Sequence, residues 1–394
     1  MKILIYTHEF PPFPGGLATT SYKLAKGFQA AGIDTTVLAP TYSKNDKIQD
    51  IDFNFSINRM GTLSRNHGIP SPIREVAGLL SLSKYLSQTT PDVILLVTRE
   101  AHVVGGMILD LDKYNVMVRV AGYEAKRFLL GRKWLNKLQG VALRKLYLGA
   151  HKIISPSNST KQLLIDAKIP ESKVRVIHNG VKSELILRYV DNSELELIRK
   201  QYSIKNTEKV ILTVSRLVPG KGQDKVIEAL SKVRNQYDNF KYLVVGDGSY
   251  RKALSDLVQS KNLQDKVIFA GSIPNERVNH FYDLCDIFVM VNRTIKTKEN
   301  IEGLPNVLIE AASRAKPIIT GLDGGSNEAV EHGKSGYVAN GENIDQIAEY
   351  LLELLTNEQK SKDFGINGKQ KMLNEFTEEE MIEKYIQTIN AIEE

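Results

Sequence analysis

Cysteine is nearly absent from this sequence, and long apolar runs are absent altogether. The 394 residues contain one cysteine, Cys285, which excludes an internal disulfide framework and any metal site built from several cysteines. No uninterrupted apolar run approaches the roughly 18 residues of a membrane span, and Val93–Val97 is typical of the longest. Polar His8 and Glu9 follow the first short apolar run, so no signal peptide is expected and the predicted location is the cytoplasm.

The composition is that of a folded protein, but charge is divided unevenly along the chain. Hydrophobic residues make up 42% and charged residues 25%, which argues against disorder, and the length favours two domains. Residues 1–182 carry 25 Lys and Arg against 13 Asp and Glu, a net charge of +12, whereas the remainder has a net charge of −6. A basic half is typical of proteins that meet nucleic acid, anionic lipid or a phosphorylated substrate.

Short runs rich in Val, Ile and Leu recur along the chain, separated by amphipathic stretches with the spacing of helices. The runs do not alternate polar with apolar residues, as expected for strands buried on both faces of a parallel sheet. This order of strands and helices predicts an α/β fold with doubly wound sheets. The expected strands are Lys2–Tyr6, Thr35–Ala39, Asp92–Val97, Val116–Ala121, Lys152–Ser155, Val174–Ile177, Val210–Val214, Lys241–Val245, Val267–Ala270, Ile287–Val291, Pro317–Thr320 and Gly336–Val338.

The chain divides into four predicted segments. Residues 1–182 form an N-terminal domain, 183–206 a polar linker region, and 207–376 a C-terminal domain. Residues 377–394 form a final helix, whose apolar residues recur at helical spacing.

Two strand ends combine glycine with groups that suit a phosphate. Gly15 and Gly16 separate the first strand from a helix, where backbone N–H groups can approach an anion, although a tight turn explains the pair equally well. The strand that begins the second half leads through Arg216 and Lys221 into a helix, and two cations at the carboxyl end of a strand suit a diphosphate. Gly246–Gly248 forms a second glycine turn at the end of the next strand.

Two carboxylates lie eight positions apart, at Glu302 and Glu310. If Pro305 opens a helix, Glu302 lies in the preceding loop and Glu310 lies two turns into the helix among apolar residues. A glutamate in such surroundings needs a partner, and sugar or ribose hydroxyls would suit it. The alternative is a charge on a solvated helix face.

Other motifs fail on their spacing or setting. Gly333–Ser335 reads GKS but lacks the earlier glycine of a phosphate-binding loop, and the GxGxxG of dinucleotide binding does not follow the first strand. Asp110 and Asp112 have the spacing of a metal-binding pair but close a helical stretch. The seven histidines form no paired-ligand spacing, so no metal site is predicted.

Six segments, taken in order, span nearly the whole chain: Pro11–Gly16, the HNGV turn His178–Val181, Ser215–Gly222, Gly246–Gly248, Glu302–Ala311 and Gly324–Val330. Together they make the chain similar to glycosyltransferase family 4, the retaining enzymes of the GT-B fold. The resemblance implies two Rossmann-like domains facing across a cleft, with the acceptor on the N-terminal domain and a nucleotide sugar on the C-terminal one. It also implies that the final helix crosses back to the N-terminal domain.

The resemblance assigns roles to individual residues. Arg216 and Lys221 are expected to clamp the donor diphosphate without a metal ion, Glu310 to bind the ribose, and Glu302 to bind the transferred sugar. Two cations stabilise the charge of the leaving group, and retention without an obvious nucleophile implies front-face attack, with the departing phosphate taking the acceptor proton. The catalytic residues are thus Arg216, Lys221 and Glu302, and the donor-binding residues are Gly15, Gly16, Arg216, Lys221, Gly246, Gly248, Glu302, Gly303, Leu304, Pro305, Asn306 and Glu310.

The sequence departs from the family pattern at one position. The family commonly has a histidine followed by glycine and then an acid after the strand Val116–Ala121. This sequence has Ala121 in place of the histidine and Glu124 as the acid. The usual sugar-contacting histidine is therefore missing, and His102 is considered as a substitute.

Residues 119–152 combine nine Lys and Arg with a single acid and with scattered apolar side chains. A basic helix that carries Trp and Leu can lie in a membrane interface. Arg127, Arg132, Lys133 and Trp134 are therefore predicted to form an acceptor or membrane side. The expected acceptor is a lipid-linked or phosphorylated saccharide of bacterial surface polysaccharide or lipopolysaccharide synthesis, with the enzyme peripheral on the inner face of the cell membrane. The alternative is that the apolar residues pack into the domain and the cations are solvated.

Three other functions are compatible with parts of the sequence. An NAD-dependent oxidoreductase or sugar epimerase uses Rossmann domains, but it requires the missing dinucleotide fingerprint. A non-enzymatic nucleic-acid binder would use the basic half, but no RNA- or DNA-binding motif is present. A GT-B synthase acting on a soluble small molecule is poorly separated by sequence from an enzyme with a lipid-linked acceptor.

Overall fold

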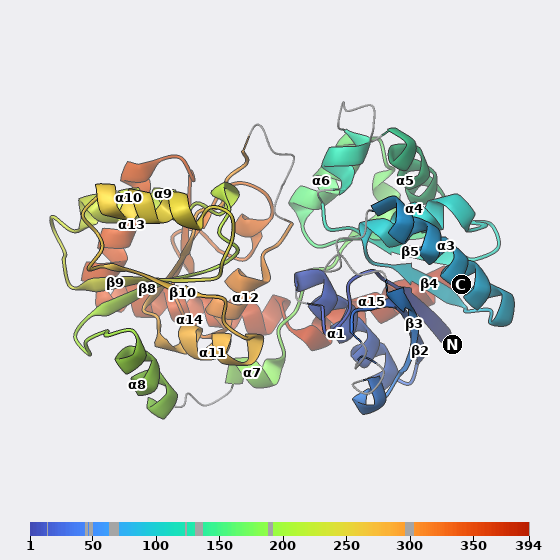
Figure 1. Cartoon of the computed structure of the whole chain (residues 1–394), viewed down its shortest axis with the longest axis horizontal. Helices are drawn as coiled ribbons and strands as arrows, with labels where there is room; N and C mark the ends of the chain where they lie inside the picture. The colour runs from blue at the N-terminus through green and yellow to red at the C-terminus, as the bar shows by residue number, and fades with distance from the viewer. Residues whose placement is uncertain are drawn as a thin grey trace. The chain divides into compact units, whose positions relative to one another are not determined.

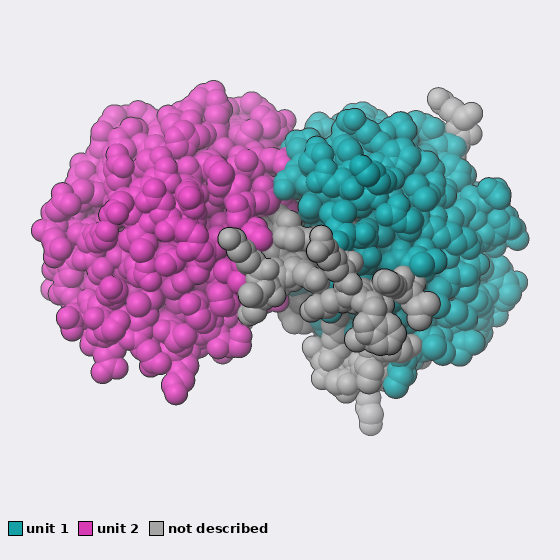
Figure 2. Space-filling view, turned by 90° about the horizontal axis from the view of Figure 1, so that it is seen from above, with its two compact units in different colours: residues 1–179, 378–394 teal, residues 180–377 magenta. Residues whose placement is uncertain are grey.

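The computed structural model shows two α/β units, which confirms the predicted fold class. It describes residues 1–13, 15–43, 46, 50–62, 71–122, 124–130, 137–187, 192–295 and 303–393. Unit 1 comprises Met1–Asn179 and Glu378–Glu394, and unit 2 comprises Gly180–Thr377 (Figure 2).

Unit 1 contains a seven-stranded parallel sheet in the order β3-β2-β1-β4-β5-β6-β7 (Figure 1). Its strands are β1 (Lys2–Tyr6), β2 (Asp34–Thr41), β3 (Ser56–Thr62), β4 (Val93–Leu96), β5 (Asn115–Arg119), β6 (Lys152–Ser155) and β7 (Val174–Val176). Its helices are α1 (Gly16–Ala30), α3 (Ser71–Gln88), α4 (Arg99–Ile108), α5 (Lys137–Gly149), α6 (Asn158–Asp166) and α15 (Glu378–Glu393), with short turns η1 (Asp50–Asp52), the π-helical η3 (Ala125–Leu129) and η5 (Glu171–Lys173).

Both faces of the unit 1 sheet are buried, as the continuous apolar strands predict. Ile3 and Ile5 of β1 pack on α1 and α15, whereas Leu4 and Tyr6 point to the opposite face, which α3, α4 and α5 cover. The last helix, α15, buries Met381, Ile382, Tyr385 and Ile389 against α1, so the C-terminal helix belongs to the N-terminal unit, as the family resemblance implies.

Unit 2 contains a six-stranded parallel sheet in the order β10-β9-β8-β11-β12-β13. Its strands are β8 (Lys209–Val214), β9 (Phe240–Val245), β10 (Val267–Gly271), β11 (Ile287–Met290), β12 (Ile318–Gly321) and β13 (Gly336–Ala339). Its helices are α7 (Ser183–Leu187), α8 (Asn192–Gln201), α9 (Gln223–Val233), α10 (Arg251–Ser260), α11 (Asn275–Leu284), α12 (Asn306–Ser313), α13 (Ile344–Thr356) and α14 (Glu358–Glu375), with the 3₁₀ turns η6 (Pro219–Lys221) and η7 (Ser326–Glu328).

Helices cover both faces of the unit 2 sheet (Figure 1). Helices α9, α10 and α13 lie on one face, where Leu230, Leu254 and Leu351 are buried together. Helices α8, α11 and α12 lie on the other face. Cys285, at the end of α11, is buried there, and burial raises the pKa of its thiol to about 12, so it is a packed core residue.

The region from 183 to 206, expected to be a linker, differs from that prediction. It contains α7 and α8, whose Ile186 and Ile198 are buried in the core of unit 2. The chain leaves unit 1 earlier, after Asn179. The polar composition of the segment hid the few apolar side chains that attach it to the core.

In both sheets the first strand of the unit lies in the interior of the sheet. The next strands of the chain are added on one side of it, and the later strands are added on the other side. In unit 2 this reversal falls between β8 and β11, and in unit 1 between β1 and β4. Open α/β sheets bind ligands outside the carboxyl ends of the strands at such a point. The segments that follow β8 and β11 are therefore where a ligand is expected to bind in unit 2.

Candidate functional site

The loop that follows β8, residues 215–222, carries both predicted cations and is termed the cation loop. Lys221 is buried, with 9% of the residue exposed, whereas Arg216 is exposed. Gln223, the first residue of α9, donates from Nε2 to Ser215 Oγ at 2.8 Å and to the carbonyl of Arg216 at 3.1 Å. The structure thus holds an ammonium and a guanidinium on one anchored loop at the reversal point of the sheet.

Gly222 brings the start of α9 against the end of β11. Its φ is +77°, and a Cβ placed here would lie 2.2 Å from the carbonyl oxygen of Val291. Any other residue would push the two segments apart, so the position requires glycine. Arg293 N also donates to Gly220 O at 2.9 Å, so the cation loop lies beside the chain that leaves β11.

The turn after β9 supports the cation loop from the neighbouring strand. Leu217 N donates to Asp247 O at 3.0 Å. A Cβ on Gly246 would lie 2.0 Å from Ser215 O, and one on Gly248 would lie 2.4 Å from Leu217 O. Close backbone packing accounts for both glycines, and their contact with a donor stays a prediction.

The second predicted carboxylate, Glu310, lies on α12, which begins at Asn306 after the buried Leu304 and Pro305. Tyr282 of α11 donates its hydroxyl to Glu310 Oε2 at 2.7 Å. Burial, together with the charge of Glu310, raises the pKa of Tyr282 well above its usual value, so the hydroxyl stays protonated and keeps donating. Glu310 is thus a half-buried, oriented carboxylate; Glu302 lies outside the described residues, and Gly303 directly follows that gap.

Arg293 is a site residue that sequence reasoning missed. Its guanidinium binds Asp224 in a two-pronged pair, with Nη1 to Oδ1 at 2.9 Å and Nη2 to Oδ2 at 2.6 Å. Burial lowers the pKa of Arg293, but the hydrogen bonds and charge of Asp224 outweigh it and leave the pKa raised. The available signal was an arginine directly after a buried strand, at the same sheet edge as Lys221.

The first loop of unit 1 contains the glycine pair predicted to lie against a donor. Gly15 caps α1 with a φ of +149°, and α1 begins at Gly16. Glu9 is buried in the same loop, and a Cβ on Gly15 would lie 3.7 Å from Glu9 Oε2. A longer loop rather than a tight turn joins β1 to α1, with Gly15 as the cap of the helix. A role of the glycine pair toward the donor stays a prediction.

Ala121, at the position where the family has a histidine, donates its backbone N–H to the side chain of Glu124. This carboxylate is buried, it accepts from Ala121 N at 3.2 Å, and burial raises its pKa to about 7. The suggestion that His102 replaces the missing histidine is wrong. His102 is fully buried, its ring nitrogens bond Leu96 O and the Tyr147 hydroxyl, and burial lowers its pKa to about 3.

The predicted basic and apolar surface of residues 119–152 is only partly a surface. Phe128 and Leu146 are buried in the core of unit 1, as the packing alternative requires. Arg127 and Leu130 are exposed. Arg132, Lys133 and Trp134 lie outside the described residues. Helical apolar residues in a basic stretch thus divide between core and solvent.

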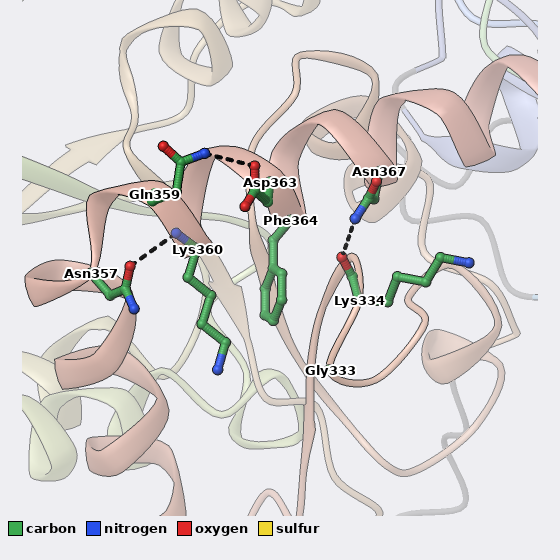
Figure 3. A pocket seen from close by; sticks show the side chains of 8 residues that line it. All are labelled: Gly333, Lys334, Asn357, Gln359, Lys360, Asp363, Phe364 and Asn367. Atoms are coloured by element: carbon green, nitrogen blue, oxygen red, sulfur yellow. Dashed lines mark hydrogen bonds between the residues drawn. The ribbon is translucent and has the colours of Figure 1, made fainter.

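A surface pocket of about 480 Å³ lies elsewhere in unit 2, before β13 and at the start of α14 (Figure 3). It is at the amino end of β13, whereas the cation loop follows the carboxyl end of β8, so it is separate from the candidate site.

Among the described residues, no group of three or more His, Cys, Asp or Glu is placed to hold a metal ion. In the same part of the chain, no helix combines the length and the apolar character that a membrane span requires.

Comparison with known proteins gives matches over both units of the chain. Residues 195–371 match the family Glycosyl transferases group 1, and residues 14–185 match Glycosyltransferase Family 4. A GDP-mannose-dependent alpha-(1-6)-phosphatidylinositol monomannoside mannosyltransferase of Mycobacterium tuberculosis is 26% identical over 94% of this chain and 93% of its own. An alpha-monoglucosyldiacylglycerol synthase of Acholeplasma laidlawii is 23% identical over 91% of this chain and 89% of its own.

The fold is also that of a solved relative. The structure of Anabaena Alr3699/HepE in complex with UDP and glucose superposes with a TM-score of 0.80 and 20% identity, covering 99% of this chain and 100% of that one. The two family matches together account for nearly all of both units. The N-terminal part of the chain thus matches Glycosyltransferase Family 4 and the C-terminal part matches Glycosyl transferases group 1, and the protein is a glycosyltransferase with the two-domain GT-B fold.

Proposed function

We propose that this glycosyltransferase moves a sugar, with retention of anomeric configuration, from a nucleotide-diphosphate sugar to a lipid-linked saccharide of a bacterial cell surface. The observation that carries the donor assignment is the cation loop, with Lys221 buried and Arg216 exposed at the reversal point of the unit 2 sheet. Glu310, oriented by Tyr282, supplies a carboxylate for the ribose hydroxyls.

In the proposed reaction the bond between the anomeric carbon and the phosphate oxygen breaks while the acceptor oxygen bonds to that carbon on the same face. The departing diphosphate takes the acceptor proton. Negative charge grows on the diphosphate as the bond breaks, and the ammonium and guanidinium of the cation loop stabilise it. Neither unit needs to supply a nucleophile for this step.

A screen of donors tests the proposal. UDP-, GDP- and ADP-sugars are added in turn, and thermal stabilisation and slow donor hydrolysis are measured, with NAD as a ligand that should not bind. At least one nucleotide sugar should stabilise the protein and be hydrolysed. NMR of the transfer product then reports the anomeric configuration. No response to any nucleotide sugar, or a product of inverted configuration, would contradict the proposal.

Chelation should leave the activity unchanged. Because Lys221 and Arg216 supply the positive charge at the leaving group, EDTA should alter neither nucleoside diphosphate binding nor turnover of the preferred donor. The measurement is calorimetric binding of UDP and GDP, and donor hydrolysis, before and after dialysis against EDTA. Activity that disappears with the chelator and returns with Mn²⁺ or Mg²⁺ would show that the two cations are insufficient.

We also propose that unit 1 rests on an anionic membrane surface, where a lipid-linked acceptor would be reached. The mycobacterial and Acholeplasma relatives are named for phosphatidylinositol and diacylglycerol compounds, which supports a lipid acceptor here. On α5, Val141 has 68% of its surface exposed, and exposed Lys145 and Leu148 follow at helical spacing. Ile73, Val76 and Leu80 of α3 form a second exposed apolar stripe.

Co-sedimentation with phosphatidylcholine vesicles, with and without phosphatidylglycerol, measures this binding. We expect binding only with the anionic lipid and less of it at raised salt. Lys145→Glu should weaken it at least about five-fold, since each cation near an anionic surface contributes about 1 kcal/mol. Lys252→Glu, an equal charge change on the exposed face of α10 in unit 2, is the control. Binding that ignores lipid charge and salt, or no binding, would favour a soluble acceptor.

A further inference from the structure

The four residues after β11, Val291 to Thr294, are held from two sides. On the α9 side, Val291 O packs against Gly222, and Arg293 N donates to Gly220 O at 2.9 Å. The Arg293 side chain then binds Asp224, in the first turn of α9, through both terminal nitrogens. Three contacts thus join this segment to the residues on either side of Lys221.

On the other side the same segment is joined to the loop after β12. Asn292 Nδ2 donates to Asp323 O at 2.6 Å, and Thr294 N donates to Asp323 Oδ2 at 2.5 Å. A Cβ on Gly321 would lie 1.9 Å from Asn292 O, so the two backbones are in close contact. The chain that continues from Thr294 toward Gly303 and α12 therefore starts from a fixed point.

The charge of Arg293 is engaged by carboxylates of the chain itself. Its terminal nitrogens are engaged by Asp224, and its Nε lies 2.7 Å from Glu342 Oε1. The side chains of Arg293 and Asp224 are 8% and 10% exposed, and such a desolvated two-pronged pair resists exchange for another anion. A guanidinium held in this way fixes geometry rather than meeting a phosphate.

We propose that Arg293 is a positioning residue for the transfer reaction, acting through its pair with Asp224. The pair holds Lys221 at the diphosphate. It also fixes the position of Val291 to Thr294, from which the chain continues to Glu302 and α12. The inference rests on the proposed role of Lys221 in the donor site. Because misplacing a reacting group by about 1 Å costs about 10²-fold in rate, loosening the pair should lower activity without removing any donor contact.

A double-mutant cycle tests this. Arg293→Met, Asp224→Asn and the double variant are compared with the unmodified enzyme by calorimetric titration of UDP and GDP and by hydrolysis of GDP-mannose and UDP-glucose. Each single change should weaken binding or turnover by about 10–100-fold, and the double variant should be no worse than either single one, since both remove one shared contact. Arg293→Lys should rescue little, because an ammonium cannot make the two-pronged pair.

The control separates positioning from general stability. Lys266 is a similarly buried cation at the amino end of β10, and it pairs with Asp238 at 3.0 Å. Lys266→Met should lower the melting temperature as the Arg293 variants do, but should leave UDP and GDP affinity unchanged. If Arg293→Met fails to fold, Arg293→Lys and Asp224→Glu provide the same comparison.

Two results would overturn the inference. Additive losses in the cycle would mean that Arg293 and Asp224 act independently and not as a pair. An Asp224→Asn variant with unchanged affinity and turnover would mean that the pair positions nothing. Lys221→Ala, measured in the same titrations, separates a failure of the proposed donor site from a failure of the positioning role. If it leaves nucleotide binding intact, the proposed donor site is wrong; if it weakens binding while the pair variants do not, only the positioning role is wrong.

Discussion

Lys221→Ala is expected to lower sugar transfer by about 10²–10³-fold, because removing one preorganised charge partner of a leaving group costs about 3–4 kcal/mol. The buried ammonium lies beside Gly222 at the start of α9. In the Lys221→Ala variant, water would compensate for the lost charge less well here than at an exposed site. Arg216→Ala should act in the same direction. Its effect should be no larger, because Arg216 is exposed and its interaction is more strongly screened.

Steady-state kinetics with the preferred donor, together with circular dichroism, measures this effect. Lys232→Ala is the matched control, since Lys232 lies in the last turn of the same helix, is exposed and pairs with Asp345 at the surface. The Lys232 variant should keep its turnover. Turnover close to that of the unmodified enzyme in the Lys221 variant would show that the cation loop does not hold the diphosphate.

Glu310→Ala is expected to reduce kcat/KM by about 10²–10⁴-fold, since hydrogen bonds from two hydroxyls to a charged group are worth about 1.5–3 kcal/mol each. Tyr282→Phe should reduce it about ten-fold, because the carboxylate remains but loses a hydrogen bond that orients it. The ordering of these two variants is the specific expectation, since a glutamate with no ligand contact would give the same small loss in both.

Nucleotide binding by calorimetry separates this role from that of Glu302. Glu310→Ala should weaken UDP or GDP itself, whereas Glu302→Ala should lower transfer more than nucleotide binding. Glu349→Ala, on the exposed side of α13, is the control for loss of a glutamate from a helix of unit 2. Unchanged nucleotide affinity in the Glu310 variant would argue against a ribose contact.

Local pattern identified the elements that carry the site. Continuous apolar strands between amphipathic helices predicted the two parallel sheets, because strands buried on both faces leave no polar alternation. The cation loop could be placed at a strand end because Arg216 and Lys221 directly follow β8 in the chain. Glu310 could be placed on a helix because Pro305 precedes an apolar run. In each case residues close in sequence determine the answer.

Residues far apart in sequence could not be paired in this way. Asp224 and Arg293 lie 69 positions apart, and Tyr282 and Glu310 lie 28 apart. The sequence around each of these residues does not indicate which distant residue it will contact. The basic stretch failed for a related reason: helical spacing shows that residues share a face, but whether Phe128 or Val141 lies in the core depends on the neighbouring helices.

The sequence by itself determined the fold class and the positions of every strand but β3, whose residues are not a continuous apolar run. It also supplied the residues that are proposed to meet a diphosphate and a ribose. These follow from side-chain chemistry and short-range periodicity. Only the tertiary structure decided that the polar 183–206 segment packs into unit 2, that His102 is a core residue, and that Arg293 is bound by Asp224. Burial and long-range pairing depend on how the sheets bring distant segments together, and that arrangement is a property of the whole fold.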